Sequence, residues 1–398
     1  MKRIPFLRYV LALAIVLISL PTNAVTDSLQ VSLLTCAPGN ESYSFYGHTA
    51  IRIHDLRTNE DVVYNYGMFD SRKPHFVWNF IMGRTDYELG TTPFESFIAS
   101  YVMRGRYVDE QVLDLTPNEA QRLNEALREN ARPEQRGYRY NFMNDNCTTR
   151  AVERIEQCVG GTITYTTEHQ PEVSFRDIIH GLTAEHPWSS LGNDLLLGAE
   201  VDTLLSRKGE MFSPAHAEEY MAEAVVLRSD GSERPLVKET FRYPVMHPLT
   251  DKSPFITPNM VALLLMVLTC VCTWHEWRKK KIGKMGNTLD ILLTLLQGGA
   301  GCIIALLFFC SEHPAVGSNW LVMWLNPLPL LWLPLQIWRT SHGKRDIYSP
   351  VLIGVLLLFC ICGHMGVQKF PTAVWVLASV LLTRACARTF INIGQQNK

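Results

Sequence analysis

The sequence predicts an exported α+β domain followed by an all-α bundle of five membrane-spanning helices. Three observations predict this fold class. The N-terminus combines a basic start, an apolar run and a stretch of small residues. The next part of the chain has strand-like segments first and helix-like segments later. From about Pro254 onward, long apolar segments follow one another to the end of the chain.

The first residues have the layout of a secretory signal peptide. Lys2, Arg3 and Arg8 precede an apolar run over residues 10–20, and small residues follow up to Ala24. An uncleaved membrane anchor is the alternative, and either would export the domain that follows. We therefore expect a signal peptide over 1–24, a periplasmic domain over 25–253 and a transmembrane domain over 254–398.

Three strands are predicted near the start of the exported domain. Alternating residues in Leu29–Leu34 predict the first strand, and the β-branched sequence HTAIRI predicts a second that begins at His48. The segment 61–69 reads as a third strand, paired with the second through a turn at 55–60. His48 is therefore expected at the first position of a strand, beside a polar loop.

A further strand is predicted over 106–115, directly before a helix with a strong start signal. Thr116 is the expected N-cap, Pro117 the first helical residue and Glu119 the third, and the helix is expected to continue to Glu129. Segment 138–142 reads as another strand. Later helices are expected around 174–182, 193–206 and 214–227, and the proline-rich segment 231–258 is expected to be a linker or a collar on the bilayer.

The stretch NDNCTTRAVERIEQCVG predicts a helix that starts at or just before Cys147. Polar turn residues precede the cysteine, and apolar residues follow it at helical spacing, at Ala151, Val152, Ile155 and Val159. A thiol at a helix N-terminus lies near unpaired backbone N–H groups and the positive end of the helix dipole. Cys147 is thus either a nucleophile or a small buried core residue.

The apolar segments and the charges between them predict the membrane topology. Each segment is close to the ~20 residues that a helix needs to cross a bilayer. The segments are 256–274, 289–309, 319–338, 349–367 and 372–391. Basic residues cluster after the first and third and near the end of the fifth, whereas the other two loops have almost none. This asymmetry predicts an inner-membrane protein with its large domain in the periplasm and its C-terminus in the cytoplasm.

Three cysteines fall in the exported domain, and the other seven of the ten lie in or beside the apolar segments. The three are Cys36, Cys147 and Cys158. In an oxidising compartment an odd number leaves at least one thiol unpaired. A disulfide between Cys36 and Cys158 is one possibility, and it would leave Cys147 free.

Few classes of catalytic site are compatible with the exported domain. It has no HExxH, CxxC, Walker or GxSxG motif and no basic–aromatic pattern for nucleic acid, so we expect no metal, no cofactor and no nucleic-acid partner. What remains is His48 at a strand start and Cys147 at a helix start. A thiol nucleophile needs a base and a group that orients the base, in any chain order. The alternative is that both residues are structural.

Four segments resemble one known family. YSFYGHTAIRI, FVWNFIMGRTDYELG and YNFMNDNCTTR resemble the exported domain of Lnb-type lipoprotein N-acyltransferases, and SEHPAVGSNWLVMWLNPLPLLWLPL resembles their membrane region. The order of histidine before cysteine is similar to that of permuted papain-like folds such as the lecithin:retinol acyltransferase group. The resemblance implies transfer of an acyl chain from a membrane phospholipid to the α-amine of diacylglyceryl-cysteine lipoproteins, with Cys147 as nucleophile and His48 as base.

Five further site residues complete the expectation. Asn65 is expected to orient His48, because Tyr64 and Tyr66 have the opposite strand parity. The backbone N–H of Thr148 is expected to bind the oxyanion. His313, Asn319 and Trp324, in or beside the third span, are expected to contact lipid. A cysteine hydrolase of the envelope (peptidase, amidase or phospholipase) and a non-enzymatic membrane scaffold remain alternatives.

Overall fold

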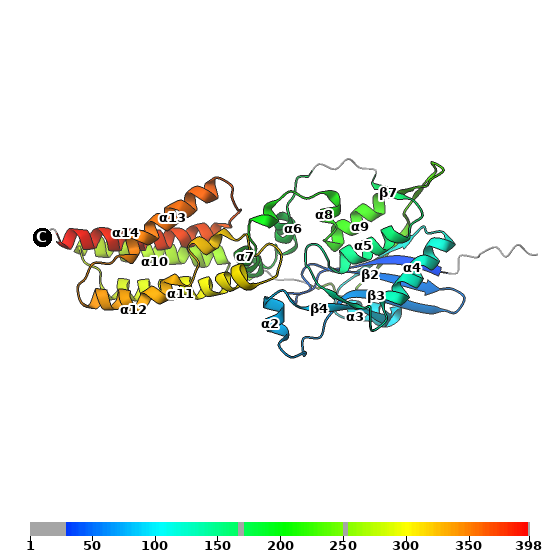
Figure 1. The fold of residues 1–398 in the computed structure, drawn as a ribbon, viewed down its shortest axis with the longest axis horizontal. Coiled ribbons are helices and arrows are strands. Elements are labelled where there is room, and N and C mark those ends of the chain that lie inside the picture. The colour runs from blue at the N-terminus through cyan, green and yellow to red at the C-terminus, as the bar shows by residue number, and fades with distance from the viewer. Residues whose placement is uncertain (1–28, 166–170, 250–253, 397–398) are drawn as a thin grey trace, which may run out of the picture.

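The computed structural model describes residues 29–165, 171–249 and 254–396. Figure 1 shows two parts placed end to end, a sheet-rich domain and a bundle of long helices. The α+β domain followed by an all-α membrane bundle is therefore confirmed. The predicted signal peptide lies outside the described residues.

The periplasmic domain is built on a seven-stranded antiparallel sheet. In sheet order, the strands are β10 (Val237–Tyr243), β5 (Val108–Leu113), β1 (Leu29–Cys36), β2 (His48–Asp55), β3 (Glu60–Met68), β4 (Asp86–Pro93) and β6 (Gly137–Arg139). The predicted β2–β3 hairpin is present, with Ile51 opposite Tyr64. Both faces of the central strands are covered, which is why β1 is buried at almost every position instead of alternating.

Helices cover the two faces of the sheet unequally. On one face lie α4 (Pro117–Asn130), α5 (Cys147–Cys158) and α9 (Pro214–Glu223), and α3 (Phe94–Val102) lies on the other. The larger core joins Leu33 and Ile51 of the sheet to Leu123 and Ile155 of α4 and α5. The smaller core joins β1, β2 and β3 to Phe94 and Phe97 at α3.

Local capping explains where α4 and α5 begin. The predicted capping box of α4 is present, with Thr116 and Glu119 each bonding the other's backbone N–H. α5 begins at Cys147 behind the N-cap Asn146, whose side-chain oxygen accepts from the N–H groups of Thr148 and Thr149. The helix start therefore fixes the position of the Cys147 side chain.

The later part of the domain differs from the prediction. The helix expected over 193–206 is instead α7 (Pro187–Leu196) followed by a short 3₁₀ turn, η1 (Ala199–Asp202). The helix expected over 214–227 ends at Glu223, and residues 224–227 form β8, between β7 (Thr162–Tyr165) and β9 (Glu233–Pro235). The expected linker contains β9 and β10, and β10 joins the main sheet beside β5. The last two errors share one cause: strand pairing is non-local, so local propensity does not reveal it.

The bundle contains five apolar helices. The 3₁₀ turn η2 (Trp320–Met323) comes before the third of them. They are α10 (Pro258–Lys279), α11 (Lys284–Cys310), α12 (Leu328–Ser341), α13 (Tyr348–His364) and α14 (Thr372–Gln396). Counting η2 with α12, four segments of the part of the chain that the structure describes are long and apolar enough to cross a membrane, and α13 is apolar but has 17 residues. At ~1.5 Å per residue α13 is about 26 Å long, slightly short of the ~30 Å hydrocarbon core.

Two short helices join the parts. α6 (Phe175–Leu182) and α7 lie between the sheet and the outer ends of the bundle (Figure 1). The chain after α11 bonds directly to the segment after α7, through Gly198 N–H to Ala315 O at 2.7 Å and Ala199 N–H to Ser318 O at 3.1 Å. Asn319 donates to Leu195 O at 2.7 Å. The catalytic candidates and the bundle are therefore held in one defined arrangement.

Candidate functional site

His48 and Cys147 lie together where β2 begins beside the start of α5. The adjacent residues tie the two elements, because the hydroxyls of Thr49 and Thr148 are 3.1 Å apart. The imidazole of His48 and the backbone N–H of Thr49 lie close enough to the Cys147 thiol to lower its pKa. The structure thus brings together the histidine at a strand start and the cysteine at a helix start.

The surroundings of Cys147 favour the thiolate. Burial by itself raises the pKa of the thiol, but the charge and hydrogen bond of His48 and the Thr49 N–H lower it, and the resulting pKa is about 7. Burial by itself lowers the pKa of His48, because it disfavours the charged ring. The negative sulfur of Cys147 and the hydrogen bond to Asn65 raise the pKa by more, so the net shift is upward. A thiolate–imidazolium pair is therefore accessible near neutral pH.

Asn65 contacts the far side of the His48 ring. Its Oδ1 is 2.5 Å from His48 Nε2, and its Nδ2 is 3.3 Å from the sulfur of Met68. An Nε2–H that donates to Asn65 leaves Nδ1 free to accept a proton. Asn65 is buried on β3, with the parity opposite to that of Tyr64 and Tyr66. This contact fixes both the tautomer and the plane of the ring.

Gly67 lies beside the place where the two side chains meet. It has a φ of +87°, and a side-chain carbon there would lie 3.5 Å from Cys147 Cβ and 3.9 Å from His48 Cε1. The left-handed backbone favours glycine, and the sulfur–imidazole contact lies beside it. Sequence reasoning missed this residue, although a glycine in the middle of the strand pattern VVYNYGMF is a sign of such close approach.

A cavity of about 140 Å³ opens beside Cys147 and His48. Seven of its 16 lining residues are Phe or Tyr: Tyr43, Tyr46, Phe69, Tyr87, Tyr140, Phe142 and Phe212. They come from the β1–β2 loop, the end of β3, β4, the segment before α5 and the segment before α9. Such a lining suits an apolar group such as an acyl chain.

The structure corrects the predicted oxyanion donor. The backbone N–H of Thr148 donates to Asn146 Oδ1 at 2.8 Å, so the helix cap already uses it. The N–H of Cys147, the first helical residue, has no acceptor among the described residues. The hydroxyl of Ser213 lines the same cavity, is buried, caps no N–H of α9 and has no partner among the described residues. These two donors replace the Thr148 N–H as candidates.

The three residues expected to contact lipid do not line the cavity. His313 Nε2 is 2.5 Å from Phe80 O, which ties the outer end of α11 to the periplasmic domain. Asn319 caps η2 and bonds the end of α7. Trp324 is buried inside the bundle against Phe359. All three make structural contacts, and the expected contact with lipid stays a prediction.

The other two exported cysteines lie apart from each other and are free thiols. Cys36 is buried at the end of β1, opposite His48, and burial raises its pKa well above the usual range. Cys158 lies at the end of α5 in the larger core. The proposed disulfide between them is absent, and Cys147 is the thiol with the lowered pKa.

Two family models match the chain. The model described as the Lnb N-terminal periplasmic domain matches residues 22–181, and the model described as the Lnb transmembrane domain matches residues 250–396. The chain belongs to the Lnb family. Membership in the Lnb family makes it an inner-membrane protein of lipoprotein maturation, with a periplasmic domain and a transmembrane domain. No curated protein and no solved structure matched the chain.

Proposed function

We propose that this Lnb protein is a lipoprotein N-acyltransferase that uses Cys147, His48 and Asn65 as nucleophile, base and positioning residue. One observation carries the proposal. The Cys147 thiol, whose pKa is lowered, lies beside the His48 imidazole, which Asn65 holds in place, and both line a cavity with many aromatic residues. The site serves acyl transfer well, because the cavity accepts an apolar chain and the thiol gives it a covalent attachment point.

In the first half-reaction, the Cys147 sulfur attacks the carbonyl carbon of a phospholipid ester. His48 Nδ1 takes the thiol proton, a C–S bond forms and the ester C–O bond breaks. The proton passes from His48 to the departing alkoxide, which leaves as lysophospholipid. The N–H of Cys147 and the hydroxyl of Ser213 are the donors available to the oxyanion.

In the second half-reaction, the α-amine of a diacylglyceryl-cysteine lipoprotein attacks the thioester. A C–N bond forms, the C–S bond breaks, and His48 moves the amine proton to the sulfur. A free α-amine has a pKa of about 8, so a useful fraction is neutral at pH 7. Placing the site next to the membrane limits the entry of water, which would otherwise hydrolyse the thioester.

The same proposal includes the topology. Basic residues after α10 and after α12 favour a cytoplasmic position for these loops, and α14 ends at the end of the bundle away from the periplasmic domain (Figure 1). We count α13 as a membrane span, so the chain crosses the membrane five times after the periplasmic domain. Five crossings put the C-terminus in the cytoplasm.

Mass spectra of lipoprotein N-termini from cells test the reaction. Cells that depend on this protein should carry lipoproteins with one amide-linked fatty acyl group on the N-terminal cysteine. Cells with Cys147→Ala should carry the free amine at normal protein levels. Full N-acylation in the Cys147→Ala strain would reject the reaction, and truncated lipoprotein chains in the wild-type strain would indicate the hydrolase alternative.

A further inference from the structure

α2 (Phe76–Ile81) is a short helix with no buried side chain. Five of its six residues are apolar, and none is buried. Val77 and Trp78 are 67% and 51% exposed, and Phe80 is exposed as well. Exposed single apolar residues are ordinary, but an apolar helix with no buried face marks a contact surface.

The C-terminus of α2 is fixed to the outer end of a membrane helix. Ser311 Oγ donates to Ile81 O at 2.8 Å, and Glu312 N–H donates to Met82 O at 2.9 Å. Both donors follow directly on Cys310, the last residue of α11. The close approach also requires Gly83, where an added Cβ would lie 2.5 Å from His313 N.

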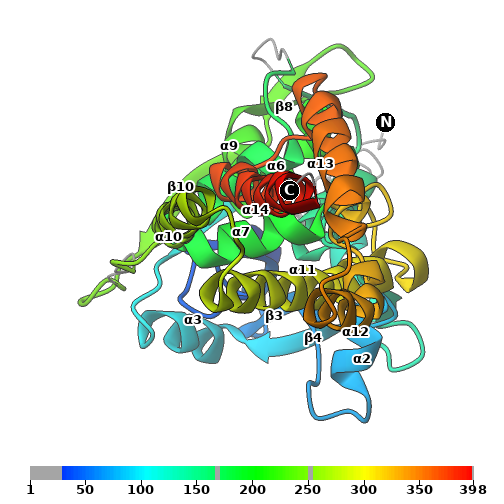
Figure 2. The ribbon, with the colours of Figure 1, turned by 90° about the vertical axis from the view of Figure 1, so that its left-hand side faces the viewer.

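This attachment sets the depth of α2. The last charged residue in α11 is Asp290, and the 20 residues from Ile291 to Cys310 carry no charge. At ~1.5 Å per residue they span about 30 Å, the thickness of the hydrocarbon core. Cys310 therefore lies at the outer boundary of the core, and α2 lies at the level of the headgroups. In Figure 2, viewed from the bundle end, α2 lies beside α11 and α12 and not behind them.

A row of aromatic rings leads from α2 to the cavity. Phe80 stacks on Phe76 with ring centres 6.4 Å apart, and Phe76 stacks on Phe69 at 5.5 Å. Phe69 contacts Tyr87 at 5.2 Å, and Tyr87 stacks on Tyr140 at 4.2 Å. The last three residues of the row line the cavity that contains Cys147. A row of aromatic contacts thus connects α2 with the cavity that contains the nucleophile.

We propose that α2 docks into the outer leaflet of the membrane and that the aromatic row guides a phospholipid acyl chain from this leaflet to Cys147. The guiding role rests on the proposed acyl transfer, whereas membrane docking of α2 does not. The donor enters from the side of the bundle, along the surface of the periplasmic domain, and not through a groove between the membrane helices. Apolar side chains at headgroup depth bury their surface among the upper acyl segments.

Docking is tested with the full-length protein in lipid nanodiscs. Phospholipids brominated near the headgroup should quench part of the tryptophan fluorescence, and Trp78→Phe should remove a measurable part of this quenching. Unchanged quenching in Trp78→Phe would overturn docking, whether or not the protein has activity.

Guidance is tested by the rate of acyl-enzyme formation with two donors, bilayer phospholipid and a monomeric short-chain phospholipid in solution. Trp78→Glu should slow acylation from the bilayer about 10-fold or more and change acylation from the soluble donor less than twofold. The matched control is Leu56→Glu, since Leu56 is 53% exposed in the turn at the other end of β2 from His48, and it should change neither rate.

Three outcomes overturn the guiding role. In the first, Trp78→Glu and the wild type form the acyl-enzyme from bilayer phospholipid at equal rates. In the second, Trp78→Glu slows acyl-enzyme formation equally with both donors. In the third, Trp78→Glu slows only the transfer to the lipoprotein, which would make α2 a docking surface for the acceptor. A wild-type protein that forms no acyl-enzyme with either donor would instead reject the proposed function, and the quenching result would stand by itself.

Discussion

At the scale of single residues, the state of the Cys147 thiol gives the first prediction. Its pKa of about 7 means that half of the thiol is ionised near neutral pH. The rate of alkylation by iodoacetamide should therefore rise with pH to a half-maximum near 7, because the thiolate is the reactive form. In His48→Ala the half-maximum should move to higher pH, because burial raises the pKa of the Cys147 thiol and the charge of His48 no longer lowers it. Peptide mass spectrometry measures the rate at Cys147, and equal midpoints in both proteins would contradict the pairing.

Asn65 gives the second prediction, as a positioning residue. Asn65→Ala should lower acyl-enzyme formation roughly 10- to 100-fold, less than loss of Cys147 or His48, because it removes the acceptor that holds the ring and leaves the base. It should also shift the pH midpoint of Cys147 alkylation upward. Asn65→Asp, which keeps an acceptor at the same place, should recover most of the rate. A loss of rate with no shift and no recovery would indicate a purely structural role.

Strand and helix patterns predict that His48 begins a strand, that Cys147 begins a helix and that Asn65 lies on the neighbouring strand, because each position depends on local periodicity. The roles of nucleophile and base came from the family resemblance, and they stay a prediction. The rest of the site was not predictable in this way. Ser213 and Phe212 come from the segment before α9, and they reach the cavity only because that helix packs on the sheet. The expected Thr148 donor failed because Asn146 caps the helix through the same N–H group.

At the scale of elements, the start of α5 gives the third prediction. Asn146→Ala removes the acceptor for two N–H groups, together with bonds from Nδ2 to Phe142 O and Phe212 O. Loss of a helix cap costs about 0.5–2 kcal/mol. Thr116→Ala, which removes the matching cap of α4, serves as the control. Both variants should lower the thermal midpoint, but only Asn146→Ala should slow alkylation of Cys147. Equal alkylation rates in both variants would mean that the cap does not position the thiol.

The elements that the sequence predicted share strong local signals. The capping boxes of α4 and α6, the apolar spacing of α5 and the length of the membrane helices are all local features. By contrast, β10 lies within a proline-rich segment and has mostly exposed residues, so its place beside β5 depends on a partner more than 100 residues away. α2 was not predicted either, because a short apolar run has no helical period to detect.

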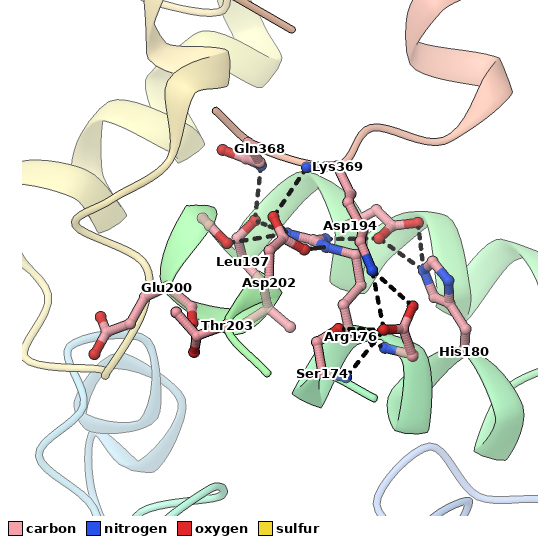
Figure 3. Close-up of polar contacts among 12 residues, drawn as sticks. Ser174, Arg176, His180, Asp194, Leu197, Glu200, Asp202, Thr203, Gln368 and Lys369 are labelled. Atoms are coloured by element: carbon pink, nitrogen blue, oxygen red, sulfur yellow. Dashed lines mark hydrogen bonds and ion pairs between the residues drawn. The ribbon is translucent and has the colours of Figure 1, made fainter. Parts of the chain in front are cut away.

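At the scale of the whole molecule, a buried ion cluster joins the periplasmic domain to the bundle (Figure 3). Arg176 is almost completely buried and bonds Asp194 at 2.7 Å and Asp202 at 2.6 Å. Lys369 lies in the loop between α13 and α14, and its backbone N–H donates to Asp202 Oδ2 at 2.9 Å. The side chain of Gln368, from the same loop, donates to Leu197 O at 3.1 Å. The cluster thereby fixes α6 and α7 on the outer end of the bundle.

This cluster gives the fourth prediction. Arg176→Ala leaves the buried Asp194 without its guanidinium partner, and such a loss costs about 3–5 kcal/mol. Limited proteolysis in detergent should then separate the periplasmic domain from the bundle. Lys369→Ala removes an exposed ion pair with Asp177, which contributes about 1 kcal/mol or less, and should leave the proteolysis pattern as in wild type. If Arg176→Ala resisted proteolysis as well as Lys369→Ala, the cluster would not hold the two parts together.

The most direct test of acyl transfer through Cys147 is the intact mass of the purified protein after exposure to phospholipid alone. The chemistry predicts a mass increase of one fatty acyl group, located on Cys147 and removed by hydroxylamine, with one lysophospholipid released per site. Adding a diacylglyceryl peptide with a free α-amine should then move the acyl group to the peptide. An unmodified mass with phospholipid, together with N-acylation of the peptide by the Cys147→Ala protein, would contradict the central claim.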